Sequence, residues 1–321
     1  MLHLVVADDL TGAADAAAPF AMAGRRTQLV LGAVTPGEPA WTRRERVEVV
    51  ALTTESRRLP PAVAAERVGD ACRGLGAAEV FKKVDSTLRG NVHVEVEAAA
   101  RAVGATEVVV CPAFPAVGRT VVDGTLCLWG RPVARVADHV PAGAVVVDAS
   151  TDADLDAVAA RHGPGVLLVG SGGLAAAVAR AGPQRARPAP PPPGRGTIVV
   201  VAGSDHEATR SQAGALVGCT VIVPPPAPGA EPLAVARLLA RQAVGCWPGP
   251  VAGLVLSGGE TAAAVLSALG ACAIDLVGEL EAGVPLGRVV GGRADGVPVV
   301  LKAGGFGDRE TLVHAVEWLR R

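Results

Sequence analysis

Short apolar runs rich in β-branched residues alternate along this chain with Ala-rich runs of helical composition, and this alternation is the strongest constraint on its fold. The first half begins with LHLVVA at 2–7 and AADAAAPFAMAG at 13–24. The pattern resumes in the second half with TIVVVAGS at 197–204, GLVLSGGE at 253–260 and VPVVLKAGG at 297–305. Such alternation is typical of a mostly parallel sheet with helices on both faces. The sequence therefore predicts an α/β fold, with second-half helices near 206–217, 260–269 and 308–320.

The segment PQRARPAPPPPGRG at 183–196 interrupts this alternation. Pro lacks a backbone N–H and fixes φ, so the segment favours an extended polyproline II spacer over a helix or a central strand. The length of 321 residues is sufficient for two domains with separate cores. We predict two domains, each a mostly parallel sheet flanked by helices: residues 1–182 and 197–321, joined by a Pro-rich linker at 183–196.

The composition argues against nucleic acid and membranes as partners. Thirty basic and thirty-one acidic residues give a net charge of -1, and the chain has no Tyr and only four Phe and four Trp. It therefore offers neither a positive field nor many stacking surfaces for bases. The opening MLHLVVADDL meets two aspartates too early for a secretory signal, and no apolar run reaches the roughly 18 residues of a membrane span. We expect a cytoplasmic protein.

Chemistry is expected at the strand-to-helix junctions, because ligands of open α/β sheets bind beyond the carboxyl ends of the strands. The first apolar run ends at Ala7 and is followed by Asp8 and Asp9. Two adjacent carboxylates repel each other unless a cation or substrate hydroxyls hold them. A helix cap formed by Asp9 or Thr11 is the alternative, but one cap does not need two carboxylates. We therefore favour a site here over a cap.

The run FKKVDSTLRGN at 81–91 concentrates polar groups between a strand and a helix, namely Lys82, Lys83, Asp85, Ser86, Arg89 and Asn91. Such a set suits an anionic, polyhydroxylated ligand, with Arg89 offering a bidentate grip on a carboxylate or phosphate. A solvated loop is the alternative. It explains the polarity, but not Gly90 and Asn91, which open the amide donors of the helix start to an anion.

Glycine-rich turns end the apolar runs of the second half: Gly203-Ser204, Ser257-Gly258-Gly259-Glu260-Thr261 and Lys302-Ala303-Gly304-Gly305-Phe306-Gly307. Backbone amides in such turns bind phosphates, and Thr261 could ligate Mg²⁺. Any one of these turns is explained by ordinary loop chemistry. Three of them at the strand ends of one small domain favour a nucleotide site, although none matches the Walker sequence GxxxxGK[ST].

Two further observations bear on these motifs. The run GSGGLA at 170–175 fits GxGxxA, but the acid expected about 20 residues later in the same unit is missing, so NAD or FAD is discounted. Lys is scarce, since only Lys82, Lys83 and Lys302 stand among thirty basic residues. A retained Lys favours a position that needs a compact, mobile ammonium, and chance is the alternative. All three lie in the motifs described above.

In order along the chain, these motifs resemble the four-carbon acid sugar kinases, which phosphorylate D-threonate, erythronate or 3-oxo-tetronate with ATP. The matching segments run nearly from end to end: ADDLTGAAD at 7–15, TESR at 54–57, KKVDSTLRGN at 82–91, CPAFPAVGRTVVDG at 111–124, GSGGLA at 170–175, AGS at 202–204, TRSQ at 209–212, SGGET at 257–261, GVP at 283–285 and LKAGGFGD at 301–308. The resemblance implies an ATP-dependent kinase that phosphorylates a hydroxyl of a small four-carbon sugar acid.

The resemblance also implies roles for the two domains, with the acid sugar bound by the first and ATP with Mg²⁺ by the second. The implied substrate-binding residues are Asp8, Arg57, Lys82, Ser86, Arg89 and Asn91, and the implied catalytic groups are Asp9, Asp85 and Lys83. The implied nucleotide-binding residues are Ser204, Gly258, Gly259, Glu260, Thr261, Lys302 and Gly304. Phosphoryl transfer depends on positioning and charge neutralisation, and the catalytic base is either Asp9 or Asp85.

The chain departs from the family pattern in its second half. It is shorter than family members usually are, above all between Ser204 and Gly258, and His206 and Gly305 replace a Ser and an Asn. The alternative from another class is therefore a non-catalytic relative that binds an acid sugar or a nucleotide as a sensor or partner subunit. A third interpretation is a kinase for a different hydroxy acid. The chain is also compatible with a homodimer.

Overall fold

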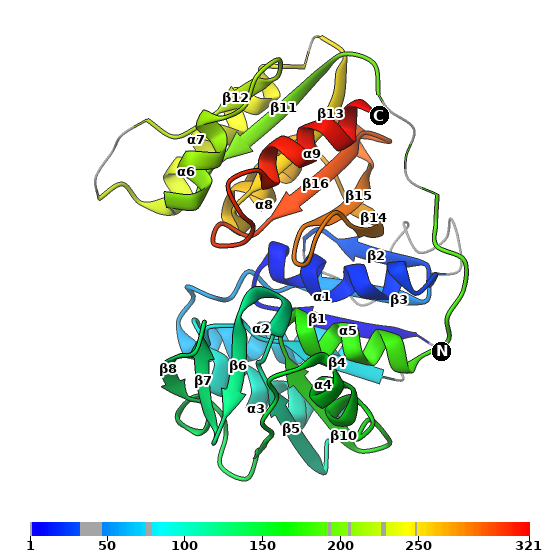
Figure 1. Cartoon of the computed structure of the whole chain (residues 1–321), viewed down its shortest axis with the longest axis vertical. Coiled ribbons are helices and arrows are strands. Elements are labelled where there is room, and N and C mark those ends of the chain that lie inside the picture. The colour runs from blue at the N-terminus through cyan, green and yellow to red at the C-terminus, as the bar shows by residue number, and fades with distance from the viewer. Residues whose placement is uncertain are drawn as a thin grey trace. The chain divides into compact units, whose positions relative to one another are not determined.

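Figure 1 shows the computed structural model of the chain, which describes residues 2–32, 47–74, 79–189, 191, 194–204, 207–225, 229–247 and 249–321. It confirms the predicted α/β class. The chain divides into two compact units: residues 1–28 with 33–187, and residues 29–32 with 188–321. The described part of the Pro-rich segment 183–196 contains neither helix nor strand, and His206 lies outside the described residues.

The sheet of the first unit has the strand order β2-β3-β1-β4-β10-β5-β9. Its strands are β1 (His3–Ala7), β2 (Thr27–Val30), β3 (Val49–Thr53), β4 (Glu79–Lys83), β5 (Glu107–Cys111), β9 (Val145–Val146) and β10 (Val166–Gly170). β1 pairs in parallel with both β3 and β4, and β10 pairs in parallel with β4 and β5. The strand order therefore reverses beside β1. Such a switch point is where open α/β sheets bind ligands.

Two groups of helices contact this sheet. The first group is α1 (Leu10–Met22), α4 (Asp152–Ala159) and α5 (Gly172–Ala181), in which α5 packs against the other two. The second group is α2 (Pro61–Arg73) and α3 (Val92–Val103), which pack against each other. Both groups contact the central strands β1 and β4, and every residue of β1 is buried.

A small antiparallel sheet of β6 (Arg119–Val122), β7 (Thr125–Leu128) and β8 (Arg131–Arg135) follows β5 and departs from the predicted alternation. Its two tight turns are Asp123-Gly124 and Trp129-Gly130, and all four residues have positive φ. Successive residues of positive φ form type I′ turns, which match the twist of a hairpin. The chain therefore turns back twice here. Short 3₁₀ helices flank this sheet at Pro115–Val117 and Val136–His139.

The second unit contains the strand order β12-β11-β13-β16-β15-β14. The strands are β11 (Thr197–Ala202), β12 (Thr220–Ile222), β13 (Val251–Ser257), β14 (Ala273–Glu279), β15 (Pro285–Val290) and β16 (Pro298–Lys302), with a 3₁₀ helix at Gly292–Ala294. β11 is parallel to β12 and β13, and β13 is parallel to β16. β15 is antiparallel to β14 and β16. A parallel core thus carries an antiparallel hairpin at one side.

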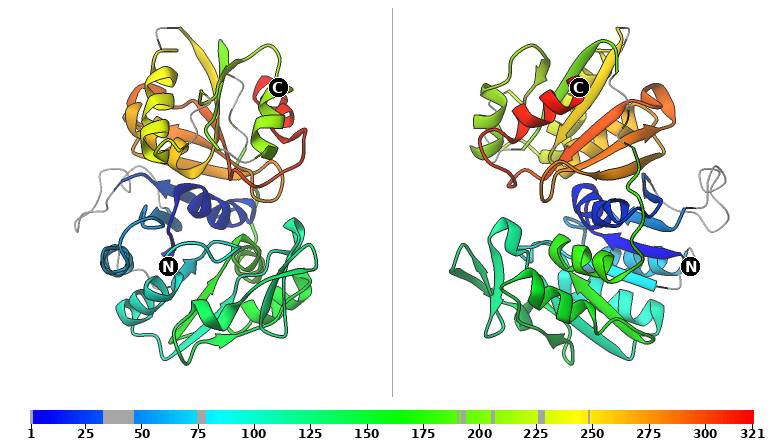
Figure 2. Two further views of the ribbon diagram at one scale, coloured as in Figure 1. Left: turned by 90° about the vertical axis from the view of Figure 1, so that its left-hand side faces the viewer. Right: turned by 45° about the vertical axis from the view of Figure 1, so that its right-hand side comes forward.

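The helices of this unit are α6 (Glu207–Gly214), α7 (Pro232–Val244), α8 (Gly259–Ala268) and α9 (Thr311–Arg320). α6, α8 and α9 lie where the sequence predicts helices, whereas α7 was not predicted. Figure 2 shows α9, in red, lying along the strands, and it packs on β13. Its buried residues Leu312, Val316 and Leu319 join Val255 and Val300 in one apolar core.

Candidate active site

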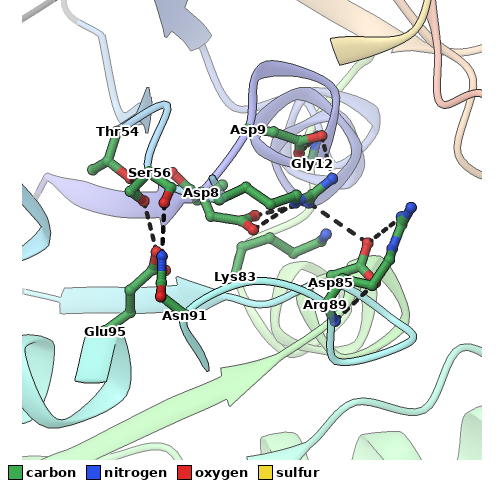
Figure 3. Close-up of polar contacts among 12 residues, drawn as sticks. Asp8, Asp9, Gly12, Thr54, Ser56, Lys83, Asp85, Arg89, Asn91 and Glu95 are labelled. Carbon is green, nitrogen blue, oxygen red and sulfur yellow. Dashed lines mark hydrogen bonds and ion pairs between the residues drawn. The ribbon is translucent and has the colours of Figure 1, made fainter. Parts of the chain in front are cut away.

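The carboxyl ends of parallel strands meet at one edge of the first unit. Ala7 at the end of β1 is in register with Thr53 of β3, and Lys83 at the end of β4 is in register with Gly170 of β10. The residues that follow these strands therefore come together. Figure 3 shows the result, in which side chains from segments far apart in the sequence face one another.

Arg57, which follows β3, binds three carboxylates. Its Nε and Nη2 donate to Asp8 at 2.7 and 2.9 Å, and its Nη1 donates to Asp9 at 2.8 Å. Its Nη2 also lies 3.5 Å from Asp85 Oδ1. Burial alone would lower the pKa of Arg57, but Asp9 and Asp8 outweigh it and raise that pKa. A guanidinium from the chain itself therefore relieves the repulsion between the adjacent aspartates.

Asp85 is the most strongly bound carboxylate of this cluster. Arg89 donates to it from Nε and Nη2 at 3.0 and 2.7 Å, and Thr87 donates from its amide at 3.0 Å. Burial acts to raise the pKa of Asp85, but the hydrogen bonds of Arg89 and the charge of Arg57 hold it well below its usual range. Ser86 is buried in the same turn. The Arg89 side chain is 68% exposed, so the remainder of its guanidinium is open to a ligand.

Lys82 and Lys83 are adjacent in β4 and therefore point to opposite faces of the sheet. Lys82 is fully buried, with its Nζ 2.9 Å from Glu95 Oε2. Lys83 Nζ lies 3.7 Å from Asp15 Oδ2 and 3.1 Å from the position that a Cβ on Gly12 would occupy. The ammonium of Lys82 is used in this buried ion pair, and its role in substrate binding stays a prediction. Lys83 is the lysine that faces the start of α1.

A buried network supports the loop that carries Arg57. Ser56 Oγ donates to Glu95 Oε1 at 2.6 Å and shares a hydrogen bond of 2.6 Å with Thr54 Oγ1. Asn91 Nδ2 donates to two backbone carbonyls of the loop, both at 2.9 Å. Figure 3 shows these side chains on the far side of the loop from Asp85. Both amide hydrogens of Asn91 thus hold the loop, and its role in ligand binding stays a prediction.

Glu55 lies outside the predicted set, although the segment TESR contains it. Its backbone has φ of 45°, in the left-handed region that non-glycine residues rarely adopt. Thr53 Oγ1 donates to its Oε1 at 2.7 Å. Burial raises the pKa of Glu55 to about 7, opposed by the hydrogen bond from Thr53 and supported by the charges of Asp9 and Asp8. Nothing in the sequence signals this backbone conformation.

Asp15 and Arg119 also lie outside the predicted set. Asp15 is buried on α1, and its two carboxylate oxygens lie 2.5 and 2.6 Å from the position that a Cβ on Gly172 would occupy. Burial raises the pKa of Asp15 to about 6, against the charge of Lys83. Burial lowers the pKa of Arg119, and the charge of Asp85 opposes that shift. Both residues lie within quoted motifs, which is the signal that could have identified them.

In the second unit, three glycine turns converge at the carboxyl ends of β11, β13 and β16, whose last residues are in register. A Cβ on Gly304 would lie 2.1 Å from Ser204 Oγ, and a Cβ on Gly203 would lie 1.9 Å from Thr261 Oγ1. Neither glycine can be replaced without movement of its neighbour. The three turns therefore approach one another because glycine at these two positions leaves room for the hydroxyls of Thr261 and Ser204.

α8 begins at Gly259, directly after the turn that ends β13. Gly258 occupies the N-cap position with φ of 98° and offers no capping side chain. The amide donors of the first helical turn, which includes Glu260 and Thr261, therefore point toward the space between the turns. The arrangement suits an anionic ligand.

Lys302 lies beneath the third turn. Its Nζ donates to the carbonyls of Ala303 and Gly304 at 3.0 and 3.3 Å, and Thr209 Oγ1 donates to the Gly304 carbonyl at 2.9 Å. Burial lowers the pKa of Lys302 to about 8, opposed by the charge of Glu281. The buried ammonium fixes the shape of this turn.

Among the described residues, no group of three or more His, Cys, Asp or Glu side chains is arranged to hold a metal ion. The densest carboxylate cluster, formed by Asp8, Asp9 and Asp85, surrounds Arg57. In the same part of the chain, no helix is both long enough and apolar enough to cross a membrane.

Known proteins resemble this chain over nearly its whole length. Residues 3–140 match a sugar-binding N-terminal domain, and residues 227–312 match a nucleotide-binding C-terminal domain. A D-threonate kinase of Bordetella bronchiseptica is 36% identical, over 98% of this chain and 97% of its own. The chain belongs to the four-carbon acid sugar kinase family. A 3-oxo-tetronate kinase of Methylobacterium radiotolerans is 28% identical and matches 98% of each chain.

The predicted family and enzyme class are confirmed: this sugar acid kinase is a phosphotransferase with an alcohol group as acceptor. The alignment with the Bordetella enzyme spans 404 positions, more than the 321 residues here, so that enzyme contains segments that this chain lacks. A crystal structure from Bordetella bronchiseptica, a domain-swapped dimer with bound citrate, is 35% identical with a TM-score of 0.51 and covers 100% of this chain and 99% of its own.

Proposed function

We propose that this protein is an ATP-dependent kinase that phosphorylates a hydroxyl of a four-carbon sugar acid of the threonate, erythronate or 3-oxo-tetronate type. The first unit would bind the acid, and the second would bind ATP. The names of the related enzymes support this substrate class, since a D-threonate kinase and a 3-oxo-tetronate kinase both match nearly the whole chain.

The convergence of three glycine turns in the second unit carries the proposal. At the strand ends, Gly203 and Gly304 leave room for the hydroxyls of Thr261 and Ser204, and the first turn of α8 after Gly258 contributes further amide donors. Such a surface binds phosphate groups through N–H donors, without a requirement for side chains. Thr261 and Ser204 supply hydroxyls beside these amides. A nucleoside triphosphate is the ligand that this chemistry fits best.

The first unit supplies the cations that an acid substrate needs. Arg89 would bind the carboxylate with the donors that Asp85 leaves unused, since its side chain is 68% exposed. Lys83 would neutralise negative charge that develops during the transfer, because its compact ammonium faces the start of α1. Asp8 and Asp9 would accept hydrogen bonds from substrate hydroxyls while Arg57 holds both carboxylates in place.

Asp85 fits an electrostatic and positioning role better than that of a base. Its low pKa makes it a weak proton acceptor, and its bonds to Arg89 and Arg57 orient both guanidinium groups. Mg²⁺ bound to the nucleotide would neutralise phosphate charge and orient the reacting group. Asp85 thus organises the cations of the pocket.

The proposal includes an oligomeric state and a cellular location. The Bordetella bronchiseptica neighbour is a domain-swapped dimer, which supports a homodimer here, to be tested by light scattering coupled to size-exclusion chromatography. The cytoplasmic location stays a prediction.

An ADP-release assay with Mg-ATP tests the function across D-threonate, L-threonate, D-erythronate, L-erythronate and the corresponding 3-oxo-tetronates. We expect turnover with at least one acid, with the phosphorylated product identified by mass spectrometry. Mg-ATP should also raise the melting temperature, because a ligand that binds only the folded state stabilises it. Absence of both product and melting shift would overturn the kinase proposal and favour the non-catalytic sensor.

A further inference from the structure

We propose that Glu55 is the general base of the phosphoryl transfer. The inference rests on the proposed function and concerns the fate of the acceptor proton. The acceptor hydroxyl gives its proton to a carboxylate oxygen of Glu55 while the hydroxyl oxygen forms a bond to the γ-phosphorus of ATP. The bond from that phosphorus to the bridging oxygen breaks, and ADP leaves with the electron pair. Glu55 releases the proton to solvent after the products leave.

The backbone around Glu55 is anchored on both sides. Thr54 Oγ1 donates to the Ala7 carbonyl at 3.0 Å, and the Ser56 amide donates to the Asp8 carbonyl at 3.0 Å. Between these anchors Glu55 adopts φ of 45°, a backbone conformation that is strained for a non-glycine residue. Strained residues held by their surroundings cluster at functional sites. The strain places this side chain at the ends of β1 and β3, beside the carboxylate cluster.

Glu55 differs from the other carboxylates at this edge in what binds it. The others described there are all paired with cations: Asp8 and Asp9 with Arg57, Asp85 with Arg89 and Arg57, Glu95 with Lys82, and Asp15 with Lys83. Glu55 accepts one hydrogen bond, from Thr53 Oγ1, and has no ion pair within 4.0 Å among the described residues. A carboxylate oxygen that already binds a cation is less available to accept a hydrogen bond from a substrate hydroxyl. Glu55 keeps its second oxygen for a substrate hydroxyl.

The surroundings of Glu55 also suit proton transfer near neutral pH. Burial raises its pKa, as do the charges of Asp9 and Asp8 from the β1–α1 loop, while Thr53 and Arg57 act in the opposite direction. The result is a pKa of about 7. A general base is most effective when its pKa is close to the working pH. Geometry and protonation therefore point to the same residue.

Glu55→Gln tests the proposal, with Glu97→Gln as the matched control. Glu97 lies on α3 and forms an exposed pair with Arg101, so the same chemical change there should leave kinetics unaltered. We expect Glu55→Gln to lower kcat roughly 100- to 10,000-fold, the usual contribution of a general base. Acid binding measured by calorimetry should change little, and circular dichroism should report the same fold. A kcat within threefold of the wild type would overturn the proposal.

The pH profile separates a proton acceptor from a merely structural residue. For the wild type, kcat/KM should rise with pH through about 7 and level off, because the ionised form is the active one. Thr53→Val removes the hydrogen bond that lowers the pKa of Glu55, so this limb should move to higher pH. An unmoved limb in Thr53→Val, or a retained limb in Glu55→Gln, contradicts the role. A wild type without activity on any acid would instead contradict the proposed function.

Discussion

The strand ends of the two units differ in composition: charged residues dominate in the first unit and glycines in the second. In the first unit, charged side chains fill the edge of the sheet, and Arg57 holds Asp8, Asp9 and Asp85 together. In the second unit, glycines leave room there for backbone and for the hydroxyls of Ser204 and Thr261, and a Cβ on Gly304 would collide with Ser204. The same place in an α/β fold thus supports two kinds of recognition. Recognition by the first unit depends on which charged side chains are present. Recognition by the second depends on glycines that leave room beside the backbone amides.

The largest expected effect comes from removing the charge that holds the first cluster together. Arg57→Met leaves Asp8, Asp9 and Asp85 without their shared cation in a largely buried place. We expect a loss of about 3 kcal/mol in the free energy of unfolding, measured by urea denaturation, together with loss of kinase activity. The control is Arg73→Met, whose exposed pair with Asp70 should contribute less than about 0.5 kcal/mol. Equal losses in both variants would remove the distinction between the cluster and an ordinary surface ion pair.

The second expected effect concerns the glycine turns at the strand ends of the second unit. Gly304→Ala adds a Cβ at 2.1 Å from Ser204 Oγ and 2.7 Å from Ser204 Cβ, so one of the two turns must move. We expect the affinity for a non-hydrolysable ATP analogue to fall roughly 10- to 100-fold in calorimetry, because displaced amides lose their phosphate contacts. Acid binding should persist. Gly214→Ala is the control, since nothing lies within 4 Å of its added Cβ. If Gly304→Ala binds the nucleotide normally, the phosphates are bound elsewhere.

The smallest expected effect tests whether a side-chain site depends on shape as well as charge. Arg89→Lys keeps the positive charge but loses the planar fork that binds Asp85 through two nitrogens. We expect KM for the acid to rise several-fold with kcat nearly unchanged, and the melting temperature to stay within about 2 °C, because the side chain is mostly exposed. Kinetics identical to those of the wild type would exclude Arg89 from acid binding.

The sequence predicts the α/β class and the strand-end positions of both clusters, because alternation and strand-to-helix junctions are local properties. The motif alone does not show that Lys82 and Lys83 have different surroundings. Their alternation along β4 places them on opposite faces of the sheet. Asn91 shows that a residue type can be rare in a chain and still have a structural role. It is the single Asn of the chain, yet it holds a loop through two backbone carbonyls.

Long-range pairing is what the sequence could not provide. Arg57 meets Asp8 and Asp9 across nearly fifty residues, and only the parallel register of β1 and β3 brings them together. The conformation of Glu55 depends on anchors on both sides of it, so no local pattern reveals it. The β6–β8 sheet had a local signal in Asp123-Gly124, a typical hairpin turn. The strand-and-helix alternation of the rest of the chain does not extend to this segment.

The three-carboxylate arrangement around Arg57 has a consequence for how this enzyme can change over generations. A neutral residue in place of Asp8, Asp9 or Asp85 still leaves the guanidinium with two partners. Among the described residues, a neutral residue in place of Arg57 leaves Asp8 and Asp9 without a cationic partner and Asp85 with Arg89 alone. Tolerance to single changes is therefore asymmetric, and effects at these positions should be non-additive. Variants with a new acceptor preference should arise first through the aspartates, while the arginine changes only in a background where the acidic charge has already been reduced.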